Sequence, residues 1–474
     1  MIDDAARAQT MAGSPPGDAL DAGAARGQAR LGGLARQLGL RSATAVVIGE
    51  VIAVGIFLTP AGMVKSLGSP LWLLIVWLVM GGMALGGAFC YGSLAARFPQ
   101  AGGGYVYLRE AYGPGVAFLY GWMCLLVMDP GLTAALGVGL ASYAGYMISL
   151  SPFGIKAVAI LAILALATAN IFAVRLGAWL MRWLTLLKLG LLGFIIIWAF
   201  ALRLGDWSNF TPFVAQRAGS AGLGGAFAGG MVGAFFSFGG WWDLSKLAGE
   251  VRDPERTLPR ALALGVVIVT VVYILTSAVF LYLVPVERVT SGETFAAQAG
   301  EVLFGRAGGT IFAAVVLVSV FGSLAGVIMA APRVYYAMAC DGLFLRSVAA
   351  VHPRLKTPAR AIALQAGLAS LLVALGAFNQ IVAYFIFVAV LFIGLTVGAV
   401  FVLRRKGGGT APESAHPAYL IPVYPVTPLL FLALVGALLV LLAGSNPTQA
   451  FLGVAVVALG LPVYYMKRRM KAEG

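Results

Sequence analysis

Three ionisable side chains lie inside long apolar stretches of the chain, where a charge is costly and rare. Lys188 is near the middle of one stretch, Asp129 precedes Pro130 in a second, and Glu50 lies about two helical turns into a third. Charged side chains at this depth usually mark a binding site or an ion path, and a buried carboxylate can bind an amine or carry a proton. These residue types therefore indicate the binding of ions or amines in an apolar environment.

The two carboxylates outnumber the lysine. Glu50 and Asp129 could each pair with Lys188, which leaves one formal negative charge, and a buried carboxylate without a full partner tends to hold a proton. Proton coupling is one interpretation of the surplus. A hydrogen-bonded structural carboxyl group that stabilises an irregular turn is the other, and the residues alone do not decide between them.

Glycines interrupt two of the apolar stretches. Residues 49–60 read Gly-Glu-Val-Ile-Ala-Val-Gly-Ile-Phe-Leu-Thr-Pro, and residues 237–243 read Ser-Phe-Gly-Gly-Trp-Trp-Asp. Glycine weakens a helix interior, and non-helical backbone at membrane depth is tolerated only where it lines a cavity or is buried in protein. The two stretches predict a binding site where both helices unwind, and close helix packing through small residues is the alternative.

Composition indicates which elements must position these residues. The 474-residue chain is 61% hydrophobic and 11% charged, with a mean hydropathy of +0.94, against about 25% charged in a typical soluble domain. A single core cannot bury that much apolar surface, and about 20 apolar residues make one membrane span. The sequence predicts twelve spans, near residues 42–65, 70–96, 114–146, 154–173, 177–202, 223–247, 259–284, 308–339, 359–377, 380–403, 422–443 and 448–466.

The spacing of the two breaks predicts an internal repeat. The interrupted spans are the first and the sixth, and such pairs at corresponding positions are typical of transporters built from inverted repeats. We expect an all-α membrane protein with five-plus-five spans and two additional C-terminal helices. The expected boundaries are a disordered basic tail over 1–40, a transmembrane domain over 41–468 and a short tail over 469–474; the repeats fall near 42–203 and 223–403, and the extra helices near 422–466.

The basic residues predict the orientation in the membrane. The formal net charge is +14, and twelve spans place both termini on one side together with 25 of the 32 Lys and Arg residues, Lys246 among them. Because cytoplasmic loops are rich in Lys and Arg, we expect both termini in the cytoplasm and the protein in the cytoplasmic (inner) membrane. The basic clusters then anchor the topology, and no nucleic-acid partner is expected. The six basic residues assigned to the other side are Lys65, Lys156, Arg203, Arg217, Arg288 and Arg306.

Other kinds of chemistry have little support in the sequence. The three cysteines, Cys90, Cys124 and Cys340, lie in or at the ends of apolar runs, so we expect free thiols rather than disulfides or metal ligands. The two histidines lack metal-ligand spacing, and the membrane part has no nucleophile turn or phosphate loop. We expect no cofactor, no metal and no enzymatic activity.

Three ordered motifs carry a family resemblance. Residues 53–57 read Ala-Val-Gly-Ile-Phe before Pro60, and residues 236–241 read Phe-Ser-Phe-Gly-Gly-Trp before the loop Glu-Val-Arg-Asp-Pro-Glu-Arg-Thr-Leu-Pro-Arg at 250–260. Further similar stretches lie between Phe321 and Pro358. In these motifs the chain resembles the amino acid, polyamine and organocation (APC) transporter superfamily, and within it the bacterial relatives of the L-type amino acid transporters. The similarity covers nearly all of residues 34–467.

The resemblance implies a LeuT-type fold and a substrate site between the unwound parts of spans 1 and 6. An α-amino acid would bind there to free backbone groups at the ends of half-helices, which suit a carboxylate and an ammonium. Ala53 and Val54 replace the Gly-Ser of the family motif, which adds bulk and removes a hydroxyl, so we expect small or unbranched ligands. The implied substrate-binding residues are Ile52, Ala53, Val54, Gly55, Phe236, Phe238, Gly239 and Gly240.

The resemblance also implies gating and ion-site residues. Phe236 matches an aromatic gate on the extracellular path, and Trp241 is a second gating candidate. Lys188 matches a lysine that replaces the cation of sodium-coupled relatives, with carbonyls near Gly49 and the hydroxyls of Ser319 or Ser323 as partners. With Glu50 and Asp129, these residues form the candidate coupling set.

The implied function is sodium-independent amino acid transport by alternating access, as an exchanger or a proton symporter. A polyamine or organic-amine permease of the same fold is an alternative, as is a channel or a transport-dead sensor. Animal relatives form a disulfide with a single-span glycoprotein through a cysteine between spans 3 and 4. Residues 143–156 contain no cysteine, so we expect no such heavy chain.

Overall fold

The computed structural model describes residues 34–172, 174–220, 222–289, 292–376, 378–406, 421–445 and 447–472. Most of the expected N-terminal tail, together with residues 473–474 of the C-terminal tail, lies outside these ranges. The described residues are helices and short connections, with a single isolated bridge between Leu38 and Val251 and no strand. The expected all-α architecture is therefore confirmed.

The helices follow the apolar runs of the sequence. In chain order the α-helices are α3 (Leu40–Val51), α4 (Gly55–Leu67), α5 (Pro70–Arg97), α6 (Gly104–Tyr112), α7 (Pro114–Met123), α8 (Asp129–Ile148), α9 (Pro152–Phe172), α10 (Val174–Ala201), α11 (Leu223–Phe238), α12 (Pro254–Leu283), α13 (Gly292–Phe304), α14 (Gly308–Ala330), α15 (Pro332–Cys340), α16 (Ala359–Leu375), α17 (Phe378–Lys406), α18 (Val426–Ser445), α19 (Pro447–Ala458) and α20 (Gly460–Ala472). The π-helix η1 (Cys124–Met128) joins α7 to α8, and the 3-10 helix η3 (Trp241–Glu250) follows α11. The short 3-10 helices are η2 (Trp207–Phe210), η4 (Val286–Arg288), η5 (Gly305–Ala307) and η6 (Arg346–Ala349).

Local chemistry explains several boundaries. Proline occupies the first turn of α5, α7 and α12, where its missing N–H costs nothing. Gly68 and Gly376 end α4 and α16 in the left-handed conformation that glycine adopts without strain. These residues place the helix ends near the ends of the apolar runs.

Among the described residues, ten helical segments are long and apolar enough to cross a membrane, and the bent pair α3–α4 adds an eleventh. The count falls one short of the twelve spans predicted, because the ninth run forms the 17-residue α16. At 1.5 Å per residue, α16 spans about 26 Å, somewhat less than a hydrocarbon core of about 30 Å.

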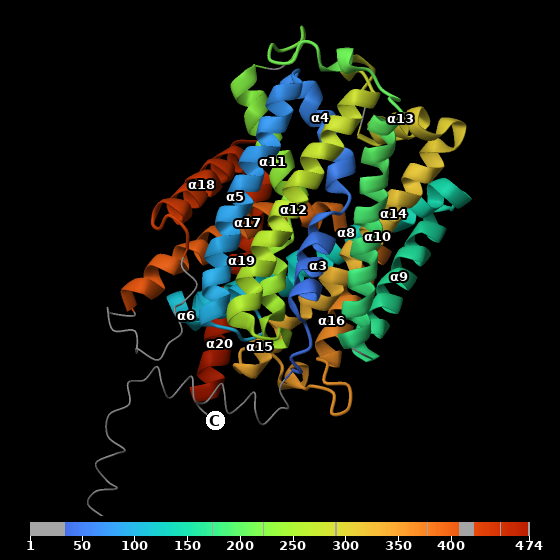
Figure 1. Ribbon diagram of the computed structural model, residues 1–474. Coiled ribbons are helices and arrows are strands. Elements are labelled where there is room, and N and C mark those ends of the chain that lie inside the picture. The colour runs from blue at the N-terminus through green and yellow to red at the C-terminus, as the bar shows by residue number, and fades with distance from the viewer. Residues whose placement is uncertain are drawn as a thin grey trace, which may run out of the picture.

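The helices form one bundle around the broken helix α3–α4. Figure 1 shows α3 below α4 near the middle of the bundle, and the end of α20 at the same lower end as the start of α3. The pairs α5 with α12, α3 with α12, α8 with α14, and α3 with α10 pack against each other. The unwound centre of α3–α4 is therefore surrounded by other helices.

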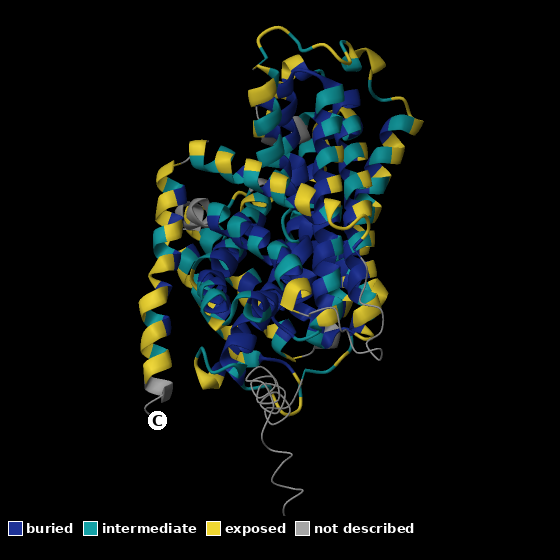
Figure 2. Cartoon of the chain, turned by 90° about the vertical axis from the view of Figure 1, so that its left-hand side faces the viewer, coloured by how far each residue is buried: buried dark blue, intermediate teal, exposed yellow. Residues whose placement is uncertain are grey.

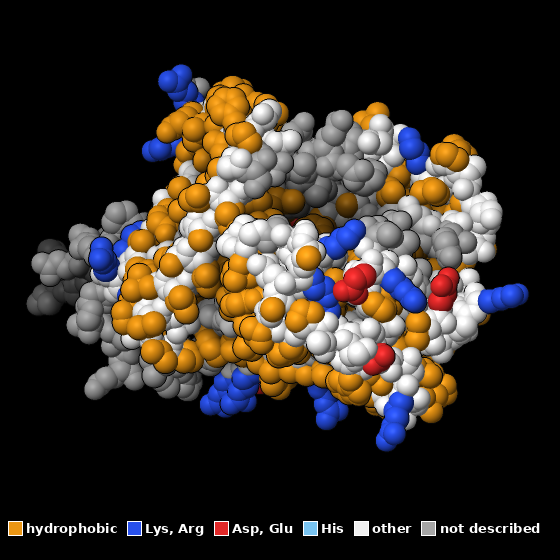
Figure 3. All heavy atoms as spheres, turned by 90° about the horizontal axis from the view of Figure 1, so that it is seen from above, with side chains coloured by type: hydrophobic (Ala, Val, Ile, Leu, Met, Phe, Trp, Pro, Cys, Tyr) orange, Lys and Arg blue, Asp and Glu red, His pale blue; other side chains and the backbone are white. Residues whose placement is uncertain are grey.

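Burial follows this arrangement. Buried residues gather toward the middle of the bundle, whereas the outer helices carry exposed residues on their outward faces (Figure 2). Many of those outward residues are large and apolar, as at Phe153, Ile197 and Val440. Seen from the end that carries the α4–α5 and α12–α13 connections, hydrophobic side chains cover much of the surface and Lys and Arg side chains are scattered over it (Figure 3). An apolar outer wall suits a lipid environment.

Candidate functional site

The first predicted break is present between α3 and α4. The helix ends at Val51 and resumes at Gly55, with a 47° bend between the two halves. The first backbone N–H of α4 to donate a hydrogen bond is that of Phe57, and its acceptor is Val54 O. The N–H groups of Gly55 and Ile56 precede that bond, so α4 presents its positive end at the break.

The second break separates α11 from η3. The α-helix ends at Phe238, and after Gly239 and Gly240 the chain continues as a 3-10 helix. Gly240 has φ of +106°, which side chains strongly disfavour. The last carbonyl groups of α11, which form its negative end, lie beside this turn.

Two contacts join the breaks to each other. The Tyr273 hydroxyl lies 2.8 Å from both Val51 O and Ser237 O, so one donor on α12 bridges the ends of α3 and α11. A Cβ atom at Gly55 would lie 2.8 Å from Ser237 Cα, which shows how closely the α4 start approaches α11. The positive end of α4 and the negative end of α11 are therefore neighbours.

A cavity of about 280 Å³ lies at this junction. Six of the predicted substrate-binding residues line it, together with apolar residues of α8, α17 and α18. The predicted residues in its wall are Ala53, Val54, Gly55, Phe236, Gly239 and Gly240. Further wall residues are Glu50, Met128, Leu132, Phe235, Ser237, Trp242, Asp243, Ile386, Ala389, Ile393, Leu438 and Leu442.

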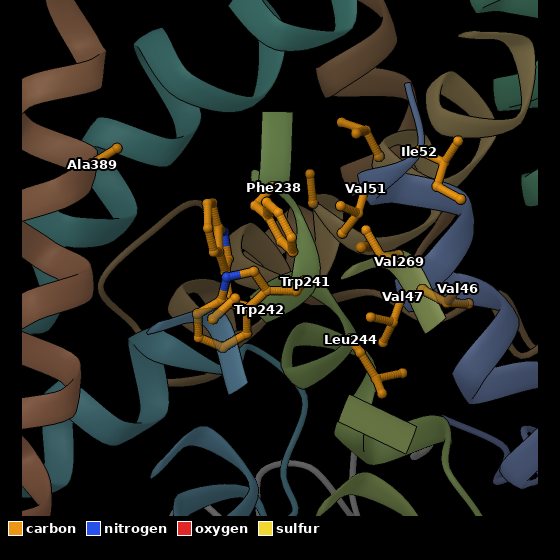
Figure 4. Packing of buried hydrophobic residues seen from close by; sticks show 14 of the residues in the cluster. Val46, Val47, Val51, Ile52, Phe238, Trp241, Trp242, Leu244, Val269 and Ala389 are labelled. Atoms are coloured by element: carbon orange, nitrogen blue, oxygen red, sulfur yellow. The ribbon is translucent and has the colours of Figure 1, made fainter. Parts of the chain in front are cut away.

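Two of the predicted substrate-binding residues, Ile52 and Phe238, lie outside the cavity wall. Ile52 is buried, and its carbonyl accepts from Lys188. The Phe238 ring packs on Trp77 and on Tyr273, with ring centres 6.2 Å and 5.1 Å away. Figure 4 shows Phe238 on the unwound chain after α11, with Val51 and Ile52 on one side of it and the paired rings of Trp241 and Trp242 on the other.

The aromatic residues at the junction differ in their access to the cavity. Phe236 lines the cavity and is 49% exposed. Trp241 is buried against Tyr91 and Trp242, so its ring packs in the core while the ring of Trp242 reaches the wall. Of the two gating candidates, only Phe236 lies at the cavity.

Lys188 joins the α3 end to α10 and α14. Its ammonium is fully buried and donates to the carbonyls of Gly49 (2.8 Å), Ile52 (2.7 Å) and Ser319 (2.9 Å), with Ser323 Oγ at 3.4 Å. The predicted contacts to Gly49 and Ser323 are thus present, whereas Ser319 contributes its carbonyl and not its hydroxyl. Ser323 Oγ also lies 2.7 Å from Gly49 O and reinforces the same junction.

Asp129 pairs with a different lysine. Its carboxylate lies 3.2 Å from Lys246 Nζ and accepts a 3.0 Å hydrogen bond from the Tyr335 hydroxyl. Lys246 also lies 3.0 Å from Asp243, and all three charged groups are buried. The possible pairing of Asp129 with Lys188 is not formed. The assignment of Lys246 to the cytoplasmic side was wrong, because η3 turns its side chain into the bundle.

Glu50 forms no ion pair with a basic side chain among the described residues. Its side chain is 4% exposed and lines the cavity, where its carboxyl group forms a side-chain hydrogen bond with Asp243. The possible ion pair of Glu50 with Lys188 is therefore not formed either.

Two further ion pairs lie where the chain leaves the cavity region. Arg333 Nε donates to Glu250 Oε1 at 2.7 Å, with both side chains buried. Arg109 donates to both oxygens of Asp341, which also accepts from the Tyr105 hydroxyl at 2.8 Å. Burial raises the pKa of Tyr105, and the charge of Asp341 adds to the rise. These pairs hold the α6, η3 and α15 ends together.

Asp243 and Lys246 were not predicted as buried charges. Their i, i+3 spacing directly after the Gly-Gly pair of an apolar run was the available signal, since such a pair faces one side of a helix. Tyr273 and Tyr335 gave no such signal. Their hydroxyls act through contacts that only the packing of α12 and α15 creates.

Comparison with known proteins agrees with this geometry. A family model described as amino acid permease matches residues 38–461. The chain is 32% identical over 448 residues to the serine/threonine exchanger SteT of Bacillus subtilis (strain 168), covering 93% of this chain and 99% of the relative. It is 31% identical to the human b(0,+)-type amino acid transporter 1, covering 91% of this chain and 88% of that protein.

A third relative has similar coverage. The human cystine/glutamate transporter is 29% identical over 444 residues, which cover 91% of this chain and 85% of the relative. The matches extend over nearly the whole helical bundle, including both broken helices and the cavity between them. The chain is a multi-pass membrane protein and belongs to the amino acid permease family of the APC superfamily.

Proposed function

We propose that the protein is a sodium-independent secondary transporter that carries amino acids across the cytoplasmic membrane by alternating access. The observation that carries this proposal is the meeting of two opposite helix ends at one cavity, the start of α4 and the end of α11. An amino acid presents a carboxylate and an ammonium on neighbouring atoms. Amide groups at the α4 start suit the carboxylate, and carbonyl groups at the α11 end suit the ammonium.

The relatives support the substrate class. The names of SteT, the b(0,+)-type transporter and the cystine/glutamate transporter all describe the exchange or transport of amino acids. Backbone groups form the polar part of the proposed seat, so the side chains Ala53 and Val54 do not remove it. We assign substrate contact to Ala53, Val54, Gly55, Gly239 and Gly240.

Lys188 supports independence from sodium. The ammonium of Lys188 donates to the carbonyls of Gly49, Ile52 and Ser319, so its N–H groups are not available to an external ligand. In sodium-coupled transporters a bound cation compensates the partial negative charges of the carbonyl groups at an unwound helix end. The fixed positive charge of Lys188 does the same at this junction. Phe236 closes the cavity from the α4 side during the transport cycle, since it lines the cavity and is half exposed.

The topology follows from the same proposal. Residues 42–203 and 223–403 form the two repeats, and both termini face the cytoplasm with most basic residues. The start of α3 and the end of α20 lie at the same end of the bundle, as this orientation requires (Figure 1). We expect no disulfide-linked heavy chain.

The test is uptake by the purified protein in liposomes. Labelled amino acids are offered to liposomes that are empty or preloaded with unlabelled amino acids, with and without an inward proton gradient. Transport of at least one amino acid above protein-free liposomes is expected. Dependence on internal amino acid identifies an exchanger, and gradient-driven uptake into empty liposomes identifies a proton symporter. Absence of any amino acid transport under all four conditions would contradict the proposal.

A further inference from the structure

Two arginine side chains meet where α5 and α17 end. Arg97 is the last residue of α5, and its Nη1 donates to Leu403 O at 3.3 Å. Leu403 directly precedes Arg404 in the last turns of α17. Helix α18 packs against both α5 and α17, so the place is a junction of three helices (Figure 1). The two guanidinium groups therefore belong to one small region of the surface.

Aromatic rings support both guanidinium groups. The guanidinium carbon of Arg404 lies 3.7 Å from the centre of the Tyr424 ring, just before α18. That of Arg97 lies 5.4 Å from the centre of the Phe98 ring. A guanidinium that lies over a ring is attracted to its face and presents its N–H edge to acceptors. Because the planar fork is already positioned, little conformational freedom is lost when it binds a ligand.

Within the described part of the chain, no carboxylate balances these two charges. Arg97 and Arg404 are exposed, and neither forms an ion pair with a described residue. The carbonyl of Glu110 accepts from Lys406 Nζ at 3.2 Å, but the Glu110 carboxylate pairs with Arg109. The described end of α17 therefore carries a surplus of positive charge that an external anion can balance.

The surroundings of the two arginines suit a lipid. The last turn of α17 places three basic residues directly after a long apolar run, and such clusters at the end of a membrane span attract anionic headgroups. On the neighbouring α18, the first two turns expose the large apolar side chains Val426, Leu429 and Leu430. These side chains provide an apolar surface for acyl chains beside the charged groups.

We propose that Arg97 and Arg404 bind the phosphate of an anionic phospholipid, such as phosphatidylglycerol, at the junction of α5, α17 and α18. The paired N–H donors of each guanidinium match two phosphate oxygens. The surplus of positive charge favours a headgroup without an ammonium of its own. The acyl chains lie along the first turns of α18. The bound lipid links α18 to α5 and α17, so it stabilises the folded bundle by mass action.

The first arm of the test uses the wild-type protein in dodecyl maltoside micelles. The melting temperature is measured as phosphatidylglycerol, or phosphatidylcholine with the same acyl chains, is added in increasing mole fraction. A third series, without added phospholipid, replaces sodium chloride by sodium phosphate at constant ionic strength. A saturable rise with phosphatidylglycerol is expected, well above the change in the other two series. No rise with phosphatidylglycerol, or an equal rise with phosphatidylcholine or with phosphate alone, would overturn the inference.

The second arm removes the two guanidinium groups. Arg97→Gln/Arg404→Gln is expected to raise the mole fraction of phosphatidylglycerol at half of the effect at least about tenfold, since a hydrogen bond to a charged group is worth about that factor. Arg346→Gln/Arg354→Gln is the control, because it removes two exposed guanidinium groups from the connection between α15 and α16 and lowers the net charge equally. The control should keep the wild-type midpoint.

A third variant covers the case in which Arg97→Gln/Arg404→Gln does not fold. Arg404→Lys keeps the positive charge but lacks the paired donors of the guanidinium, and should raise the midpoint several-fold. Equal shifts in the two double variants would show that the lipid responds only to net charge. An unchanged midpoint in Arg97→Gln/Arg404→Gln, or in Arg404→Lys where the double variant does not fold, would show that the lipid binds elsewhere. Each of these results contradicts the inference, and none of them bears on amino acid transport.

Discussion

Lys188 contributes more than a charge to the junction of α3, α10 and α14. Three carbonyls and one hydroxyl surround its ammonium, and two of the carbonyls belong to the residues on either side of the α3 end. Backbone groups of an unwound helix have no helical partners, so at this depth another donor must satisfy them. The lysine therefore stabilises the break, in addition to the cation-replacing role proposed for it.

Lys188→Met is expected to abolish uptake and to lower thermal stability. The substitution keeps most of the apolar stem but leaves the Gly49, Ile52 and Ser319 carbonyls without this donor, and hydrogen bonds to charged groups are worth about 1.5 to 3 kcal/mol each. The melting temperature in detergent and the initial uptake rate measure the two effects. Lys156→Met is the control, because that lysine donates to Ala374 O at the exposed end of α9 and should have little effect on either. Full uptake by Lys188→Met with an unchanged melting temperature would show that Lys188 is needed neither for transport nor for the stability of the break.

Lys246 neutralises two carboxylates at once. Lys246→Met should destabilise the protein by about 3 to 5 kcal/mol, the usual cost of leaving a buried charge without its partner. The double variant Lys246→Met/Asp129→Asn removes one of the two orphaned charges and should recover part of the loss. Thermal unfolding of the three proteins provides the comparison. Additive losses in the double variant would show that the two residues do not interact.

At the scale of elements, the close approach of α4 to α11 depends on Gly55. A Cβ atom there would meet Ser237 Cα and Oγ at 2.8 Å, and backbone cannot move away as a flexible side chain can. Gly55→Ala is therefore expected to lower substrate affinity at least about tenfold, because it separates the two helix ends that form the seat, and a small misplacement of binding groups can cost that much.

Gly62→Ala is the matched control for Gly55→Ala. Gly62 lies in the same helix, and a Cβ atom there would meet nothing within 4 Å, so the change should leave transport intact and stabilise α4 by up to about 1 kcal/mol. KM for the best substrate and the melting temperature are measured for both variants. Similar behaviour of the two would show that contact with Ser237 does not matter.

The two broken helices were predictable because glycine marks them. Gly49, Gly55, Gly239 and Gly240 interrupt apolar runs, and the breaks occur beside them. The π-helix Cys124–Met128 was not predicted, since its residues Cys-Leu-Leu-Val-Met read as ordinary helix and Pro130 follows it. Its position just before Asp129 depends on packing that periodicity does not encode.

At the scale of the whole molecule, composition and charge distribution were sufficient to predict the fold class. They were not sufficient to predict the partner of each buried charge. The apolar runs correspond to the helices, with α16 shorter than expected. Lys246 was counted with the loop residues because it lies near the end of its run, and only the inward turn of η3 brings it to Asp129. The partners of Glu50, Asp129 and Lys188 depend on which helices are neighbours, and a single sequence does not contain that information.

We propose that the carrier works without sodium because Lys188 occupies the position of the bound cation in sodium-coupled transporters. The most direct measurement is the initial rate of amino acid uptake into liposomes with sodium outside, and with all sodium replaced by choline at constant ionic strength. Equal rates are expected in the two media, since the chain itself holds the ammonium of Lys188 in place. Uptake that falls to the level of protein-free liposomes in choline and recovers saturably as sodium is added would contradict it.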